Sequence, residues 1–163
     1  MIIVSDTAPL ISLLKINQIH LLKQLFGSVV IPTAVYHELV SNEKFQREAQ
    51  IFKNLDFISI VPIKEPNTVS FLRSLTGLDL GESEAIVLSK QLKADTFIID
   101  EKRGRRTALD LGLEIIGSVG ILNLAYDNGL ITKDEAILYV TQMRKNGSRI
   151  GDKIYYGFIN SLN

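Results

Sequence analysis

The sequence predicts an α/β fold in which helices cover both faces of a mostly parallel sheet. Short apolar runs of strand length alternate along the chain with longer segments of helical pattern. This alternation is typical of a sheet built from strand-helix-strand units. Acidic residues also directly follow two of the apolar runs, and the carboxyl ends of strands are where open α/β sheets bind ligands. We therefore expect a functional site at that edge.

Three apolar runs in the first half of the chain predict strands, because each is short and bounded by turn or helix signals: residues 2–5, 28–32 and 57–61. Pro9 suits the first turn of the helix after the first strand, and Pro32 ends the second strand. The helices expected in this half cover residues 10–14, 18–25, a segment that begins at Thr33 and includes Glu38, and 43–54.

The second half of the chain continues the alternation and then becomes helical. The expected elements are helices over 67–75 and 82–92, a strand over 96–99, a helix over 107–111, a strand over 114–116, and helices over 118–127, 133–145 and 152–162. Gly112 and Gly129 separate some of these elements. We expect one domain over residues 1–163, with C-terminal helices from about residue 118.

Composition narrows the class of protein. Of the 163 residues, 46% are hydrophobic, which is enough for a buried core, and no apolar run is long enough to span a membrane. No leader pattern is present at the N-terminus, so we expect a cytoplasmic protein. The absence of cysteine excludes disulfides and thiolate zinc sites. Because the net charge is zero, any attraction to nucleic acid must be local.

Four dispersed acids, Asp6, Glu38, Glu82 and Asp100, are candidate catalytic residues and metal ligands. Asp6 and Asp100 each follow an expected strand, so both carboxylates should stand at the same edge of the sheet. Mg²⁺ and Mn²⁺ are hard cations that prefer oxygen ligands, and Mg²⁺ takes only one or two direct carboxylates. The remaining acids could bind a second ion or orient water, as hydrolysis of a phosphodiester requires.

Helix capping offers another interpretation of the same acids. Asp6 could cap the helix that follows it, Asp100 could cap a helix over residues 102–111, and Glu82 at a helix start gains from the helix dipole. Glu38 is harder to explain in this way, because it interrupts an apolar pattern on its helix. Spacing alone does not bring the four acids together.

A basic cluster, Lys102 to Arg106, directly follows Asp100 and Glu101. Arg103, Arg105 and Arg106 could hold an RNA backbone. A solvated helix start or a surface for dimer contacts would explain the same cations.

Four segments resemble the PIN domain, and most of all a prokaryotic, uncharacterised branch of that family related to VapC-type toxin ribonucleases. The resemblance covers nearly the whole chain and is carried by Ile3 to Ile11, Ile31 to Leu39, Leu80 to Ser89 and Ile99 to Arg105. It implies a three-layer α/β/α sandwich around a parallel sheet, with a ribonuclease site at the C-terminal edge that depends on Mg²⁺ or Mn²⁺. In that pattern Asp6, Glu38 and Asp100 match three of the family's acids.

The third acid of the family is usually an aspartate at a helix start, and Glu82 matches it best here. Glu84 is the competing residue, but it lies two positions further on, roughly 200° around a helix, so both side chains should not face one ion. Another departure is Ile98, where many members carry a hydroxyl residue. Ser5 or Thr7 could supply a hydroxyl that supports the metal ion or binds phosphate, and Thr7 could equally cap a helix.

The resemblance implies a metal-dependent endoribonuclease that is the toxin of a toxin-antitoxin pair, with RNA as substrate, a cognate antitoxin as partner, and a homodimeric state. The alternative is a PIN-like module that binds RNA or protein without hydrolysis. A phosphoacceptor receiver domain also places an acid after its first strand. That class is disfavoured because Glu38 and Glu82 would have no role in it.

Overall fold

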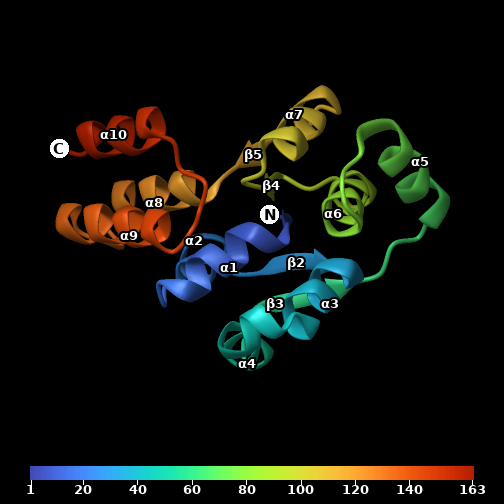
Figure 1. Cartoon of the computed structure of the whole chain (residues 1–163), viewed down its shortest axis with the longest axis horizontal. Helices are drawn as coiled ribbons and strands as arrows, with labels where there is room; N and C mark the ends of the chain where they lie inside the picture. The colour runs from blue at the N-terminus through green and yellow to red at the C-terminus, as the bar shows by residue number, and fades with distance from the viewer.

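The computed structural model describes all residues of the chain, 1–163, and contains one five-stranded sheet. The strands are β1 (Ile3–Ser5), β2 (Val29–Pro32), β3 (Ile58–Val61), β4 (Thr96–Ile98) and β5 (Ile115–Ile116). Their order is β3-β2-β1-β4-β5, and every neighbouring pair is parallel. Helices flank the sheet on both sides, and α8 to α10 gather beyond β5 (Figure 1). The predicted α/β/α sandwich is therefore confirmed.

Ten α-helices surround this sheet. They are α1 (Thr7–Lys15), α2 (His20–Phe26), α3 (Thr33–Ser41), α4 (Gln46–Lys53), α5 (Pro66–Thr76), α6 (Leu80–Leu92), α7 (Lys102–Asp110), α8 (Ser118–Asp127), α9 (Lys133–Lys145) and α10 (Asp152–Ser161), with a 3₁₀ turn, η1 (Glu43–Phe45), before α4. None of these helices has both the length and the apolar character that crossing a membrane would need.

Several helices begin at other positions than the sequence predicts, and side-chain capping explains the difference for α6 and α7. The first helix begins at Thr7, not at residue 10, because Asp6 is already the extended residue before it. For α6 the side chain of Asp79 accepts a hydrogen bond from the N–H of Glu82, so the helix begins two residues early. For α7 the side chain of Glu101 caps the N–H of Gly104, which adds a full turn ahead of residue 107.

The core is a cluster of 35 buried residues that reaches from the sheet into the C-terminal helices. Phe97, Ile98 and Ile99 in and after β4 have no exposed surface, and Phe158 of α10 belongs to the same cluster. Each such side chain stabilises the fold by roughly 1.5–3 kcal/mol when it leaves water. This close packing holds the ends of the strands in fixed positions.

The strand order produces a topological switch point between β1 and β4. From β1 the chain runs through β2 and β3 to one edge of the sheet, and then returns to β4 and β5 on the other side. A crevice forms at such a point outside the carboxyl ends of the two strands, and ligands of open α/β sheets bind there. Asp6 follows β1 and Asp100 lies two residues after the end of β4, so both acids lie at this switch point.

We predict that Gly104→Ala destabilises the fold by about 1–3 kcal/mol through overpacking. A Cβ atom at position 104 would lie 2.5 Å from Cδ1 of Ile99, a fully buried side chain that cannot move freely. Gly157→Ala in α10 is the matched control, because a Cβ there meets nothing within 4 Å and alanine favours helix. Chemical denaturation of both variants measures the difference. Equal stability of the two would contradict the prediction.

Candidate metal centre

Asp6 is the most deeply buried acid of the candidate site, with only 4% of its surface exposed. Its backbone N–H donates to the carbonyl of Ile98 at 2.9 Å, which extends the β1–β4 ladder by one residue and fixes the position of Asp6. Although Asp6 occupies the N-cap position of α1, its side chain makes no capping hydrogen bond. The capping interpretation of Asp6 is therefore wrong, and the carboxylate is left for another role.

Glu38 reaches the same region from α3. The hydroxyl of Thr7, the first residue of α1, donates to Oε2 of Glu38 at 2.8 Å. Thr7 is only 4% exposed. Its hydroxyl holds Glu38, and the N-cap position of α1 belongs to Asp6, so Thr7 is not the helix cap. Helix α3 packs against α6, and a Cβ atom at Gly81 would lie 2.8 Å from Oε2 of Glu38. Glycine at position 81 leaves the room that this carboxylate occupies.

Glu82 lies in the first turn of α6 and forms a capping box with Asp79. Its Oε2 accepts from the N–H of Asp79 at 3.2 Å, and Oδ1 of Asp79 accepts from the N–H of Glu82 at 2.8 Å. The sequence signal for this pair is the acid-x-x-Glu pattern at a helix start. The expected helix-start position of Glu82 is correct, and Asp79 is a further acid of the site that sequence reasoning missed.

Glu84 points to another part of the fold. Its Oε2 accepts a hydrogen bond of 2.9 Å from the N–H of Ala34, in the first turn of α3. This contact satisfies one of the free N–H groups at the helix start and favours a structural role. Glu82 is consequently the better candidate for the third acid.

Asp100 is held by the start of α8. Its Oδ1 accepts from the N–H of Ser118 at 2.7 Å, and its Oδ2 accepts from the hydroxyl of Ser118 at 2.5 Å. The side chain that caps α7 is that of Glu101, so the expectation that Asp100 caps this helix is wrong. Asp100 instead joins the end of the β4 segment to the C-terminal helices.

Burial, and after it the negative charge of neighbouring carboxylates, raises the pKa values of three of the acids. Burial raises the pKa of Asp6 well above its usual range, the backbone of Thr7 lowers it, and the charges of Glu82, Glu38 and Asp79 raise it further. Partial burial is also the main cause of the raised pKa of Glu38, although much of that side chain is exposed. The hydrogen bond from Thr7 lowers this pKa, and the negative charge of Asp79 raises it.

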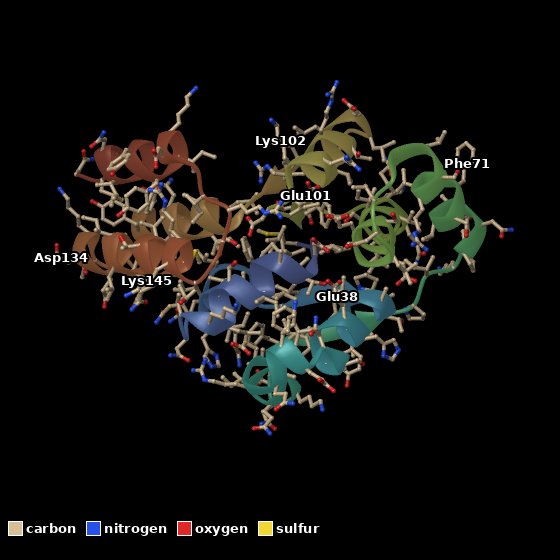
Figure 2. All side chains as sticks on the ribbon, viewed as in Figure 1. Glu38, Phe71, Glu101, Lys102, Asp134 and Lys145 are labelled. Carbon is tan, nitrogen blue, oxygen red and sulfur yellow. The ribbon has the colours of Figure 1, made fainter.

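The pKa of Glu82 is raised for the same reasons. Burial contributes most, followed by the charge of Asp79; the N–H of Asp79 lowers the pKa, and the charges of Glu101 and Glu38 raise it. Figure 2 shows Glu38 on α3 and Glu101 ahead of α7, on either side of the start of α1 in this view. The structure thus brings Asp6, Glu38 and Glu82 within electrostatic reach of one another, together with Asp79 and Glu101.

The donor chemistry of this cluster fits a hard divalent cation. All its donors are oxygens, no cationic side chain pairs with them, and no other side chain donates to the carboxylate of Asp6. No group of three His, Asp or Glu side chains is arranged closely enough to enclose an ion. The carboxylates therefore form an uncompensated negative cluster whose side chains would have to approach one another to coordinate a metal ion.

The arginines of the basic cluster have different surroundings. Arg105 is half-buried, and its guanidinium donates to the carbonyl of Ile99 at 2.8 Å, which fixes the backbone just before Asp100. Arg103 and Arg106 are exposed on α7. Of the three arginines, these two are free to contact a ligand without breaking a side-chain hydrogen bond within the protein.

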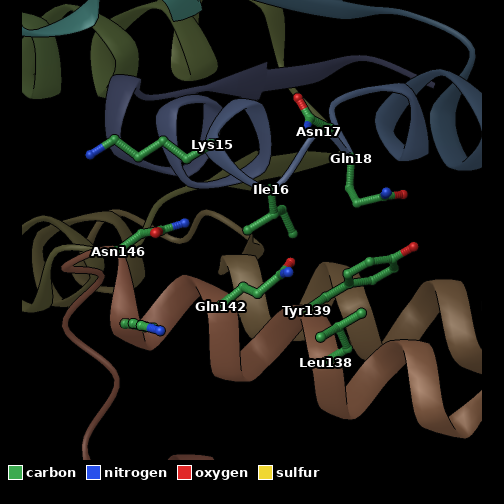
Figure 3. A pocket seen from close by; sticks show the side chains of 9 residues that line it. Lys15, Ile16, Asn17, Gln18, Leu138, Tyr139, Gln142 and Asn146 are labelled. Atoms are coloured by element: carbon green, nitrogen blue, oxygen red, sulfur yellow. The ribbon is translucent and has the colours of Figure 1, made fainter.

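One groove of the molecule is separate from the acids. It has a volume of about 500 Å³ and lies between the end of α1 and helix α9, with Gln18, Tyr139 and Gln142 among its lining residues (Figure 3). None of the candidate acids lines it.

We predict that Asp6→Asn stabilises the metal-free protein at pH 7. Because the folded pKa of Asp6 lies above its unfolded value, the stability of the wild type falls as pH rises from about 3.9 through the folded pKa. Asparagine does not titrate, so its advantage should shrink as pH falls toward 4. Denaturation in the presence of a chelator at both pH values measures this.

Asp56→Asn is the control for this experiment. The hydrogen bond and charge of Lys23 lower the pKa of Asp56, so this substitution should give no stabilisation at pH 7. A stabilising effect of Asp6→Asn that does not change with pH would rule out the electrostatic explanation.

Comparison with known proteins identifies the family. A protein-family model described as a PIN domain matches residues 2–163. No curated protein matches the chain. PIN domains are generally nucleases that typically use divalent metal ions, which agrees with a cluster of carboxylates at the C-terminal edge of a parallel sheet. The chain therefore belongs to the PIN-domain family, as its motifs and its all-parallel α/β sandwich predict.

Proposed function

We propose that this protein is an endoribonuclease that depends on Mg²⁺ or Mn²⁺ and hydrolyses RNA phosphodiester bonds. The observation that carries the proposal is the uncompensated carboxylate cluster at the β1–β4 switch point of a PIN domain. Repulsion within such a cluster destabilises the folded protein in the absence of a cation. A function that uses the negative charge would account for the presence of the cluster.

Asp6, Glu38, Glu82 and Asp100 are the proposed metal ligands. When bound, the ion would activate water and neutralise charge on the phosphodiester. Asp6 supplies the buried carboxylate at the base of the crevice, while Glu38 and Glu82 approach from α3 and α6. The unpaired negative charge around Glu38 and Glu82, which contributes to their raised pKa values, would favour binding of a cation.

The proposed RNA contacts come from Arg103 and Arg106, the two exposed arginines of α7. Both lie within six residues of Asp100, so a strand bound along α7 would pass beside the acids. The protein has no net charge that could attract RNA over long distances, which leaves these local cations to hold the phosphates. Arg105 contributes to the site by fixing the backbone at Ile99.

We predict that Asp6→Asn, Asp100→Asn and Glu82→Gln abolish Mn²⁺-dependent cleavage of single-stranded RNA, because each substitution removes a proposed ligand charge. Glu84→Gln is the matched control for Glu82→Gln. A glutamine at 84 still offers an oxygen to the N–H of Ala34 and should keep the wild-type rate. Gel analysis of labelled RNA with and without chelator measures cleavage, and circular dichroism checks the fold.

Three results would refute all or part of the proposal. Cleavage at the wild-type rate by both aspartate variants would exclude the mechanism. Loss of cleavage in Glu84→Gln with full activity in Glu82→Gln would exchange the roles of the two glutamates. If the wild type neither cleaves RNA nor binds Mn²⁺ in calorimetry, the alternative function, a PIN-like module that binds RNA or protein without hydrolysis, takes precedence. The lack of a preformed three-carboxylate metal cage favours that alternative.

We further propose that the protein is the toxin of a toxin-antitoxin pair, active in the cytoplasm as a homodimer. This rests on the resemblance of four of its segments to a prokaryotic branch of the PIN-domain family that is related to VapC-type toxins. Exposed apolar residues on the α5–α6 side, Phe71, Leu75 and Leu80, could contribute to binding a second copy or an antitoxin.

The toxin role predicts that induced expression of the wild type arrests bacterial growth, because RNA hydrolysis would stop translation. Asp6→Asn, expressed to the same level, should allow normal growth. Colony counts after induction, with immunoblots to match the amounts of protein, give the comparison. Equal growth of both cultures would contradict a toxin role while leaving cleavage in vitro as a separate question.

A further inference from the structure

Ser118 makes two hydrogen bonds to one acid of the site. Its hydroxyl donates to Oδ2 of Asp100 at 2.5 Å, and its backbone N–H donates to Oδ1 at 2.7 Å. Ser118 is the first residue of α8 and is 2% exposed. A carboxylate has about four lone-pair sites, so these two bonds fix its orientation and leave each oxygen able to accept once more.

The contact is unusual for a helix start. The residue before α8 is Gly117, which has no side chain to cap the helix, and the capping carboxylate comes instead from Asp100, 18 residues earlier in the chain. A Cβ atom at position 117 would lie 2.9 Å from Oδ1 of Asp100 and 2.9 Å from Nη1 of Arg105. Glycine at 117 therefore permits Asp100 and Ser118 to meet.

The contact between Ser118 and Asp100 also bears on position 98, where this chain has isoleucine and many family members carry a hydroxyl residue. Ile98 is fully buried in β4 and offers no polar atom to the site. Ser5 is also fully buried, and its hydroxyl donates to the carbonyl of Asp6. Among these residues Ser118 alone presents a hydroxyl to the carboxylate that follows β4.

We propose that Ser118 is a positioning residue for Asp100, and that the start of α8 is thereby part of the metal site. Partners of this kind orient a ligating carboxylate, and their loss typically weakens metal affinity by about 10–100-fold. This inference rests on the proposed function, because it requires Asp100 to be a metal ligand. A purely structural role, in which Asp100 only anchors α8, predicts altered stability and unchanged metal affinity.

The test compares Ser118→Thr with Ser118→Val, which have nearly the same shape and differ in the hydroxyl. Calorimetric titration of the metal-free proteins with Mn²⁺, without RNA, should give near wild-type affinity for the threonine variant. The valine variant should bind about 10–100-fold more weakly. Ser89→Ala is the control for loss of a buried serine hydroxyl, because the hydroxyl of Ser89 donates only to the carbonyl of Ala85 within α6. Its Mn²⁺ affinity should not change.

A second variant examines the same contact from the other side. Gly117→Ala keeps the hydroxyl of Ser118 but places a methyl group against Oδ1 of Asp100, so Mn²⁺ affinity should fall in this variant too. Equal affinities of the threonine and valine variants would overturn the inference while Asp6-dependent binding by the wild type upholds the proposed function. If the wild type shows no Asp6-dependent binding, the proposed function and this inference both fail.

Discussion

Mutual repulsion among carboxylates at the β1–β4 switch point is the constraint on which the rest of the site depends. Asp6 is nearly inaccessible to water, and negative charges of Glu38, Glu82 and Asp79 surround it. The two ion pairs of the protein, Lys23–Asp56 and Arg144–Asp152, lie elsewhere. A fold that gathers such charges needs a rigid base, and the fully buried residues of β1 and β4 provide it.

Three of the four acids are each fixed by a local hydrogen-bond partner, so repulsion does not simply turn their side chains outward. Thr7 holds Glu38, the capping box with Asp79 holds Glu82, and Ser118 holds Asp100. These contacts satisfy one or two lone pairs and leave others free, which is what a ligating carboxylate requires. Asp6 has no side-chain donor, and its backbone bond to Ile98 does the positioning.

The strand pattern correctly predicts where Asp6 and Asp100 lie. An acid that directly follows a short apolar strand of a parallel sheet must stand at the carboxyl-end edge of that sheet. Glu38 and Glu82 lie on helices, so only the family resemblance brought them to the same site. The choice between Glu82 and Glu84 depends on the packing of α3 against α6, which spacing within one helix does not contain. Ser118 was missed because its partner lies 18 residues away and belongs to another element.

Although the net charge of the chain is zero, negative and positive side chains gather in separate places. Under the proposed function this separation of charge links metal binding to RNA binding. Without a cation the acidic cluster repels phosphate, and the exposed Arg103 and Arg106 stand only a few residues beyond Asp100. A divalent ion would cancel part of that repulsion, so RNA should bind more tightly when the ion is present. Thermodynamic linkage then requires RNA to strengthen metal binding by the same factor. The carboxylates are not preformed around an ion, so under the proposed function RNA phosphates would help to complete the metal site.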